Sequence, residues 1–181
     1  MANLGYDRDE EKNAGIFAER LSPEEIAFVE QSDQERSDAL KNGCDKYINE
    51  DYCNYNGNHL FYCGAGFGSF AISYDGKFRL CPSLWDPDTI YDLRSGTVKE
   101  AFEKHTRKVK GMRSENRNFL EKCRRCPIIT LCLMCPAHAY LEKGSMDAYV
   151  EYFCKVAHAR AAALGYTGKH KNPEKEMISA E

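Results

Sequence analysis

Long apolar runs, a dominant charge of either sign and a targeting signal are all missing from this 181-residue sequence. No stretch approaches the roughly 18 consecutive apolar residues of a membrane span. The first residues also lack the basic and apolar regions of a secretory signal. The formal net charge of −3 gives no whole-chain reason to bind nucleic acid or an anionic membrane. We therefore expect a cytoplasmic protein with neither kind of partner.

Common catalytic motifs are scarce as well. No paired carboxylates, nucleophile elbow or phosphate-binding glycine loop stands out. The sequence Gly64-Ala-Gly66-Phe-Gly68 is not a dinucleotide fingerprint, because no βαβ pattern surrounds it. These glycines instead allow the backbone to approach a neighbouring group closely.

Cysteine, in contrast, is abundant. The nine cysteines are Cys44, Cys53, Cys63, Cys81, Cys123, Cys126, Cys132, Cys135 and Cys154. Disulfides do not persist in a reducing compartment, and an odd number of thiols cannot all pair. We therefore predict that these cysteines bind metal.

Four of these cysteines lie within 13 residues, in the run Cys123-Arg-Arg-Cys126-Pro-Ile-Ile-Thr-Leu-Cys132-Leu-Met-Cys135. A Cys-x-x-Cys spacing lets two thiolates from one turn reach the same metal. Both structural zinc and iron–sulfur clusters are bound in this way. The spacing alone does not choose between them.

Residues 69–81 predict a β-hairpin, because apolar residues alternate with others on both sides of Asp75-Gly76. The alternating residues are Phe70, Ile72, Tyr74, Phe78 and Leu80. Gly76 supplies the positive φ that a two-residue turn needs. Such a turn allows Cys63 and Cys81 to approach one another.

Helix signals occur at three places. Ser22 and Thr97 each precede a glutamate by three residues, which is typical of a capping box. The first helix restarts near Ser32 and ends at Gly43, with Ile26 and Val29 on one side. Asp147 is predicted to cap a last helix that ends at Gly165. The charged residues 167–181 lack periodicity and are expected to be disordered.

The order of the cysteines along the whole chain identifies a family more specifically than the four-cysteine run does. Twelve residues separate Cys63 from Gly76 and four more separate Gly76 from Cys81; the run and then Cys154 follow. This order resembles the SPASM domain, the auxiliary-cluster domain that follows the catalytic barrel of many radical S-adenosylmethionine enzymes that modify peptides and proteins. The resemblance covers residues 44–165. It is supported by Cys63-Gly-Ala-Gly, Ser69-Phe-Ala-Ile, Tyr74-Asp-Gly-Lys and Tyr91-Asp-Leu-Arg-Ser-Gly.

The resemblance implies a small cysteine-rich α+β domain, with one β-hairpin and several helices around two iron–sulfur clusters of the [4Fe-4S] type. One cluster would be held by Cys53, Cys63, Cys81 and Cys135. The other would be held by Cys123, Cys126, Cys132 and Cys154. The chain departs from the family in having two residues, where three are usual, between Cys132 and Cys135. The upstream ligand also stays open, since Cys44 or a group other than cysteine could replace Cys53.

The radical enzymes hold their catalytic cluster with Cys-x-x-x-Cys-x-x-Cys, and this triad is absent from the sequence. Only 62 residues precede Cys63, whereas a core barrel needs on the order of 200. The chain is therefore not expected to be an enzyme on its own. We divide it into residues 1–43, which resemble the exit from such a barrel, residues 44–166, the SPASM-like domain, and residues 167–181, the tail.

The expected function is metal binding with electron transfer, for peptide modification by a radical S-adenosylmethionine core protein supplied elsewhere. The domain would relay electrons, help to position a peptide or protein substrate, or both. A structural zinc-binding interaction module and an autonomous ferredoxin-like electron carrier are the alternatives. Arg124 and Arg125 would raise the reduction potential of a cluster and favour an acidic partner. His138 and His158 are weaker ligand candidates.

Overall fold

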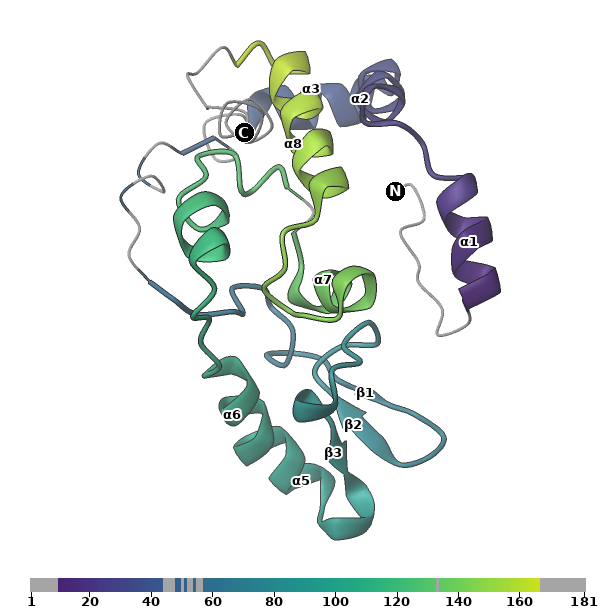
Figure 1. Ribbon diagram of the computed structural model, residues 1–181, viewed down its shortest axis with the longest axis vertical. Coiled ribbons are helices and arrows are strands. Elements are labelled where there is room, and N and C mark those ends of the chain that lie inside the picture. The colour runs from purple at the N-terminus through teal and green to yellow at the C-terminus, as the bar shows by residue number, and fades with distance from the viewer. Residues whose placement is uncertain are drawn as a thin grey trace, which may run out of the picture.

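A computed structural model describes residues 10–43, 48–49, 51, 54, 57–132 and 134–166. The predicted α+β class is confirmed by helices together with one small antiparallel sheet. Figure 1 shows the sheet with α5 and α6 at one end of the molecule, α2, α3 and α8 at the other, and α7 between them. The helices among these residues include none with the length and apolar character needed to span a membrane.

Three helices open the described chain: α1 (Glu10–Ala18), α2 (Pro23–Ser32) and α3 (Gln34–Asn42). The capping box at Ser22 is confirmed, because its hydroxyl accepts from the Glu25 N–H and the Glu25 carboxylate accepts from the Ser22 N–H. Gly43 ends α3, as predicted. Val29 does not share the buried side of Ile26, since it is 53% exposed.

The sheet has three strands in the order β1 (Ala71–Ile72), β2 (Lys77–Arg79) and β3 (Tyr91–Asp92), so a third strand joins the predicted hairpin. Ile72 pairs with Phe78, and Phe78 pairs with Tyr91. The predicted two-residue turn is wrong. The Ser73 N–H donates to the Lys77 carbonyl at 3.1 Å, which leaves three residues in the turn, and Gly76 has a φ of 77°. This is the three-residue loop with glycine in the left-handed conformation.

Burial is greatest at the end of the central strand, where Phe78 and Arg79 are buried. Phe78 and Leu80 are completely buried, whereas Phe70 and Ile72 are each 45% exposed and Tyr74 is fully exposed. The edge position of β1 explains the difference, because β1 has a neighbour on one side only. The alternation therefore predicted the strands, but it did not show how much of the first strand is buried.

A continuous helical segment follows the sheet, formed by α5 (Val98–Glu100), the π-helical turn η4 (Ala101–His105) and α6 (Thr106–Lys110). Its capping box at Thr97 and Glu100 is confirmed. The 3-10 turns η2 (Pro87–Thr89) and η3 (Leu93–Ser95) precede it. The His105 ring packs inside and lies 2.9 Å from the Thr89 carbonyl oxygen.

The last two helices are α7 (Pro136–Lys143) and α8 (Glu151–Ala163). The prediction that Asp147 caps the final helix is wrong, since α8 begins at Glu151 with Val150 as its N-cap. The Asp147 carboxylate instead accepts from the Ser114 hydroxyl at 2.7 Å and from the Ser145 hydroxyl at 2.6 Å. These bonds hold the loop between α7 and α8 against the residues that precede the cysteine run.

Apolar residues form one large core and two small ones. The large core includes Phe78, Leu80, Leu84, Val109 and Phe119, beside the sheet. The second consists of Ile128, Leu131, Ala157 and Ala161, and the third of Ala139, Val150 and Phe153. The partly buried cysteines pack at the margins of these cores: Cys81, Cys123 and Cys135 on the first, Cys126 and Cys132 on the second, and Cys132 again on the third.

Candidate metal centre

The thiols of Cys63, Cys81 and Cys135 form a first group, although the sequence separates Cys135 widely from the other two. Burial raises the pKa of the Cys81 thiol, and the neighbouring Cys63 raises it further. Burial likewise raises the pKa of Cys135, with added contributions from Cys81 and Cys63. The charges of the three sulfurs can therefore interact with one another. Cys63 is the exposed member of this group.

Cys123, Cys126, Cys132 and Cys154 form a second group. Burial raises the pKa of Cys123 to about 11, and the charge of Cys154 adds to the effect. Burial also raises the pKa of Cys132 strongly, with further contributions from Cys154, Cys123 and Cys126. Cys132 and Cys135 thus interact with different cysteines, although only two residues separate them in the sequence.

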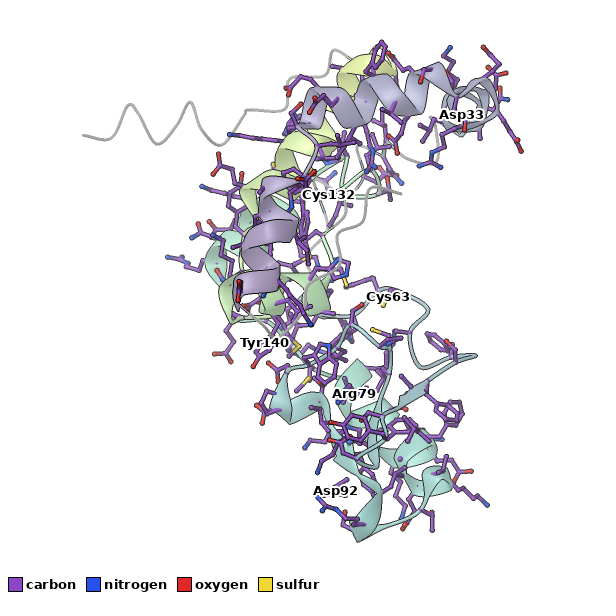
Figure 2. The ribbon with its side chains drawn as sticks, turned by 90° about the vertical axis from the view of Figure 1, so that its right-hand side faces the viewer. Asp33, Cys63, Arg79, Asp92, Cys132 and Tyr140 are labelled. Carbon is purple, nitrogen blue, oxygen red and sulfur yellow. The ribbon has the colours of Figure 1, made fainter. Side chains whose placement is uncertain are left out.

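The two groups lie at different levels of the molecule. Figure 2 shows Cys132 among the helices and Cys63 nearer the sheet, above Arg79. The π-helical turn η5 (Phe119–Cys123) carries the first cysteine of the run, and α8 carries Cys154 in its first turn. Cys53 and its alternative Cys44 lie outside the described residues, so three proposed ligands of the first group and all four of the second are described.

Backbone N–H groups surround the sulfurs at Cys-Pro turns, a signal that the sequence analysis missed. At Cys81 the N–H groups of Ser83 and Leu84 lower the thiol pKa, although burial outweighs them. At Cys135 the N–H groups of His138 and Ala137 act in the same way. Both cysteines precede a proline, as does Cys126. Proline fixes φ at a turn and leaves the next two N–H groups near the sulfur, which favours a negatively charged thiolate.

The turn at Cys126-Pro127 is closed by the Ile129 N–H, which donates to the Cys126 carbonyl at 3.1 Å. The corresponding bond at Cys81-Pro82 joins the Leu84 N–H to the Cys81 carbonyl at 3.2 Å. Three of the six prolines in the chain directly follow a cysteine. This association is readable from the sequence and points to cysteines held in defined turns.

Arg124 is buried, which corrects its predicted role in docking an acidic partner. Its side chain is 8% exposed, stacks on Tyr62 at 3.7 Å and donates to the carbonyl oxygens of His59 and Leu60 at 3.2 and 3.3 Å. Its positive charge lowers the pKa of Cys123 against the larger effect of burial. Arg124 therefore acts inside the molecule, beside the second group, whereas Arg125 is exposed.

His138 is half-buried on α7 and its ring lies 6.2 Å from that of Phe153. Burial lowers its pKa, and the charge of Arg20 lowers it further. These contacts give the ring a packing role. His158 lies on α8 and is likewise half-buried.

The described cysteines are all free thiols. Within the described ranges, no three His, Cys, Asp or Glu side chains come together closely enough to hold a single metal ion. The thiolates of a four-iron cluster bind four different irons and so need not converge on one point. Comparison with protein-family models, with curated proteins and with solved structures finds no match for this chain.

Proposed function

We propose that this chain binds two iron–sulfur clusters and serves as an accessory electron-transfer domain. Cys63, Cys81 and Cys135, with Cys53 or Cys44, would hold the first cluster. Cys123, Cys126, Cys132 and Cys154 would hold the second. The observation that carries the proposal is the crossed grouping of the thiols, because two sulfurs that are close in the sequence interact with different partners.

The residues suit such a group chemically. Burial makes isolated thiolates unfavourable at these positions, and bound iron compensates for that penalty by neutralising their charge. The N–H groups at Cys81 and Cys135 and the charge of Arg124 favour thiolate sulfur as well. A bound cluster supplies one-electron transfer, and the protein sets its potential by burial, charge and hydrogen bonds to sulfur.

The identity of the partner protein is also part of the proposal. The electrons would serve a radical S-adenosylmethionine core protein that modifies a peptide or protein, and this domain would help to position that substrate. The SPASM resemblance supports this role, as does the absence of the catalytic triad from the sequence. The proposed role is by analogy with the family, since a fold alone does not fix a function.

Anaerobic reconstitution with iron and sulfide tests the proposal. We expect brown protein with broad absorption at about 400 nm and with about eight irons and eight sulfides per chain, the content of two four-iron clusters. Colourless protein that holds zinc without sulfide would falsify the cluster and favour a structural zinc module.

A second measurement addresses the accessory role. The reconstituted chain, reduced with dithionite, should not cleave S-adenosylmethionine to methionine and 5′-deoxyadenosine. Turnover by the chain alone would show an iron open to this cofactor, and the accessory role would then be wrong.

A further inference from the structure

The outer edge of β1 presents backbone groups that point away from the sheet. β1 is an edge strand, because it pairs only with β2. The Ser73 N–H donates across the hairpin at 3.1 Å, so Ser73 and Ala71, two residues earlier, direct their backbone groups toward β2. Ile72 lies between them and directs its N–H and C=O outward. Among the described residues, no other part of the chain bonds to these two groups.

Exposed aromatic rings follow this edge. The ring of Phe70 lies 5.8 Å from that of Phe102 on η4, and the two residues are 45% and 36% exposed. Phe67 is 75% exposed. Its loop lies against the same side of the helical segment, since a Cβ added at Gly66 would be 2.8 Å from the Thr106 side chain. Apolar side chains that gather in this way mark interaction sites.

Positive charge lies at one end of the aromatic row. The Lys110 ammonium is 4.8 Å from the centre of the Phe67 ring. Arg107 is exposed and precedes Lys110 by three residues on α6, so the two side chains are neighbours on the helix surface. In the described part of the chain, no ion pair involves either cation. The sequence of residues 104–113 contains no acidic residue that would offset them.

We propose that the outer edge of β1 binds an extended, acidic peptide with apolar side chains, as a fourth strand of the sheet. The peptide backbone pairs with Ile72, and its apolar side chains pack on the rings of Phe67, Phe70 and Phe102. Its carboxylates meet the two cations. The inference rests on the proposed function, because it assigns a surface and a peptide chemistry to the positioning of the substrate.

The charges favour this peptide over a second copy of the chain. A second β1 would bring residues 69–74, Ser-Phe-Ala-Ile-Ser-Tyr, which contain no carboxylate. The next residue, Asp75, already accepts a hydrogen bond from the Ser73 hydroxyl. An acidic peptide offers carboxylates that are free to pair with Lys110 and Arg107, and complementary charge gives specificity to such a contact.

The test measures the fluorescence anisotropy of a labelled peptide mixed with the full, anaerobically reconstituted chain. The peptide alternates phenylalanine or valine with threonine at its centre and has glutamates at both ends. One control peptide has lysines in place of the glutamates, and another is N-methylated along its backbone so that it cannot pair as a strand. We expect saturable binding of the acidic peptide alone, and weaker binding as the salt concentration rises.

Two variants locate the contact. Phe67→Ala should weaken binding by about fivefold or more, the usual effect of truncating an aromatic residue that anchors an interface. Arg107→Glu should weaken it about tenfold by reversing a charge. Arg107 is preferred to Lys110, which also donates to the Cys63 carbonyl at 2.6 Å and would disturb the first cysteine group if changed.

The matched controls lie at the opposite end of the molecule (Figure 1). Phe28→Ala removes a phenylalanine of α2 that is 71% exposed, and Lys41→Glu reverses an exposed charge on α3. Neither should change the affinity for the peptide. Sedimentation of all variants shows whether the chain self-associates instead.

The outcomes separate this inference from the proposed function. A cluster-loaded chain that binds no peptide, binds the three peptides equally, or dimerises through β1 overturns the inference alone. Affinity that is unchanged in both Phe67→Ala and Arg107→Glu does the same. A chain that takes up no iron and sulfide but binds the acidic peptide supports the surface and overturns the proposed function.

Discussion

The sheet region and the helical region of this molecule differ in what holds them together. We define the sheet region as residues 57–123, and the helical region as α2, α3, α8 and the loop at residues 126–132. The sheet region buries the large side chains of Phe78, Leu80 and Phe119 almost completely. The core of the helical region contains two alanines among its four buried residues. Because apolar stabilisation follows buried area, the sheet region has the stronger hydrophobic core.

The two cysteine groups also differ in their surroundings. The first includes the exposed Cys63 and receives several backbone N–H groups around Cys81 and Cys135. In the second, Cys126 and Cys132 pack at the margin of the smaller core, whereas Cys123 packs on the large one. Metal binding and folding are coupled where a core is small. We therefore expect bound metal to contribute more to the helical region than to the sheet region.

The largest expected effect comes from separating the two groups. Cys132→Ala should remove the second cluster and Cys135→Ala the first, so each variant should lose about half of the eight irons of two four-iron clusters. Iron and sulfide analysis with electron paramagnetic resonance measures this. The Cys132→Ala variant should also lose hydrogen-exchange protection in α8, which Cys135→Ala should largely retain.

Two further variants, at the upstream cysteines, complete this experiment. Cys53→Ala and Cys44→Ala show which upstream cysteine belongs with Cys63, because the ligand variant should match the Cys135→Ala spectrum. If the Cys132 and Cys135 variants lost the same cluster, the crossed grouping would give way to one contiguous site in the run.

The sheet core should be sensitive to truncation even without metal. Phe78→Ala should lower the free energy of unfolding by about 4 kcal/mol, since it removes a completely buried ring. Phe70→Ala is the control, because Phe70 is 45% exposed although its ring lies 5.1 Å from that of Phe78. Urea unfolding of both variants measures the difference. Equal losses would mean that the half-exposed ring of Phe70 contributes as much as the buried ring of Phe78.

Local sequence signals predicted much of the fold. Ser22 and Thr97 have short-range partners, so their capping boxes follow from a few adjacent residues. Helix α7 could have been found in the same way, because Pro136 begins it and Gly144 ends it with a φ of 72°. Helix α1 has little apolar patterning and was not expected. The third strand was missed because β3, unlike β1, has neither an alternating pattern nor a hairpin turn beside it in the sequence.

Contacts between residues that are far apart in the sequence were harder to predict. Arg124 reads as a surface cation in the run, yet it is enclosed by Tyr62 and the carbonyls of His59 and Leu60. Asp147 has the right spacing for a helix cap, but Ser114 competes for its carboxylate from far along the chain. The thiol grouping was implied by a family resemblance rather than by spacing. Such contacts depend on tertiary structure, which no local pattern encodes.

An ion pair joins two of the helices of the helical region, α2 and α8. The Glu30 carboxylate on α2 accepts from the Arg160 guanidinium on α8 at 2.7 and 2.9 Å, and Arg160 also donates to the Leu131 carbonyl at 3.0 Å. Glu30→Gln should destabilise the protein by about 2 kcal/mol, because it leaves a poorly solvated cation with a weaker partner. Glu121→Gln is the control. Its exposed pair with Arg117 should contribute close to nothing.

The effect of Glu30→Gln should depend on pH. Burial alone would raise the pKa of Glu30, but the hydrogen bonds and charges of Arg160 and Arg36 lower it overall. A lowered pKa in the folded state stabilises the protein above the ordinary value of 4.5, and this contribution is lost as the pH falls through the folded-state value. The difference between wild type and variant should therefore be constant near neutral pH and shrink in acid. A difference that grew in acid would contradict this ion pair.

The smallest expected effect is at the hairpin turn of the sheet region. Gly76 has a φ of 77° and no atom within 4 Å of an added Cβ, so Gly76→Ala introduces backbone strain without a clash. The left-handed conformation costs a residue with a side chain about 1 kcal/mol, and the free energy of unfolding should fall by that amount. Gly68→Ala is the matched control, because its added Cβ also meets open space and its φ is not in the left-handed range. Both variants should keep the iron content of the wild type, since the turn is remote from Cys132 and the strain is local. A Gly76→Ala variant that lost the second cluster would show that the sheet region and the helical region do not separate as we infer.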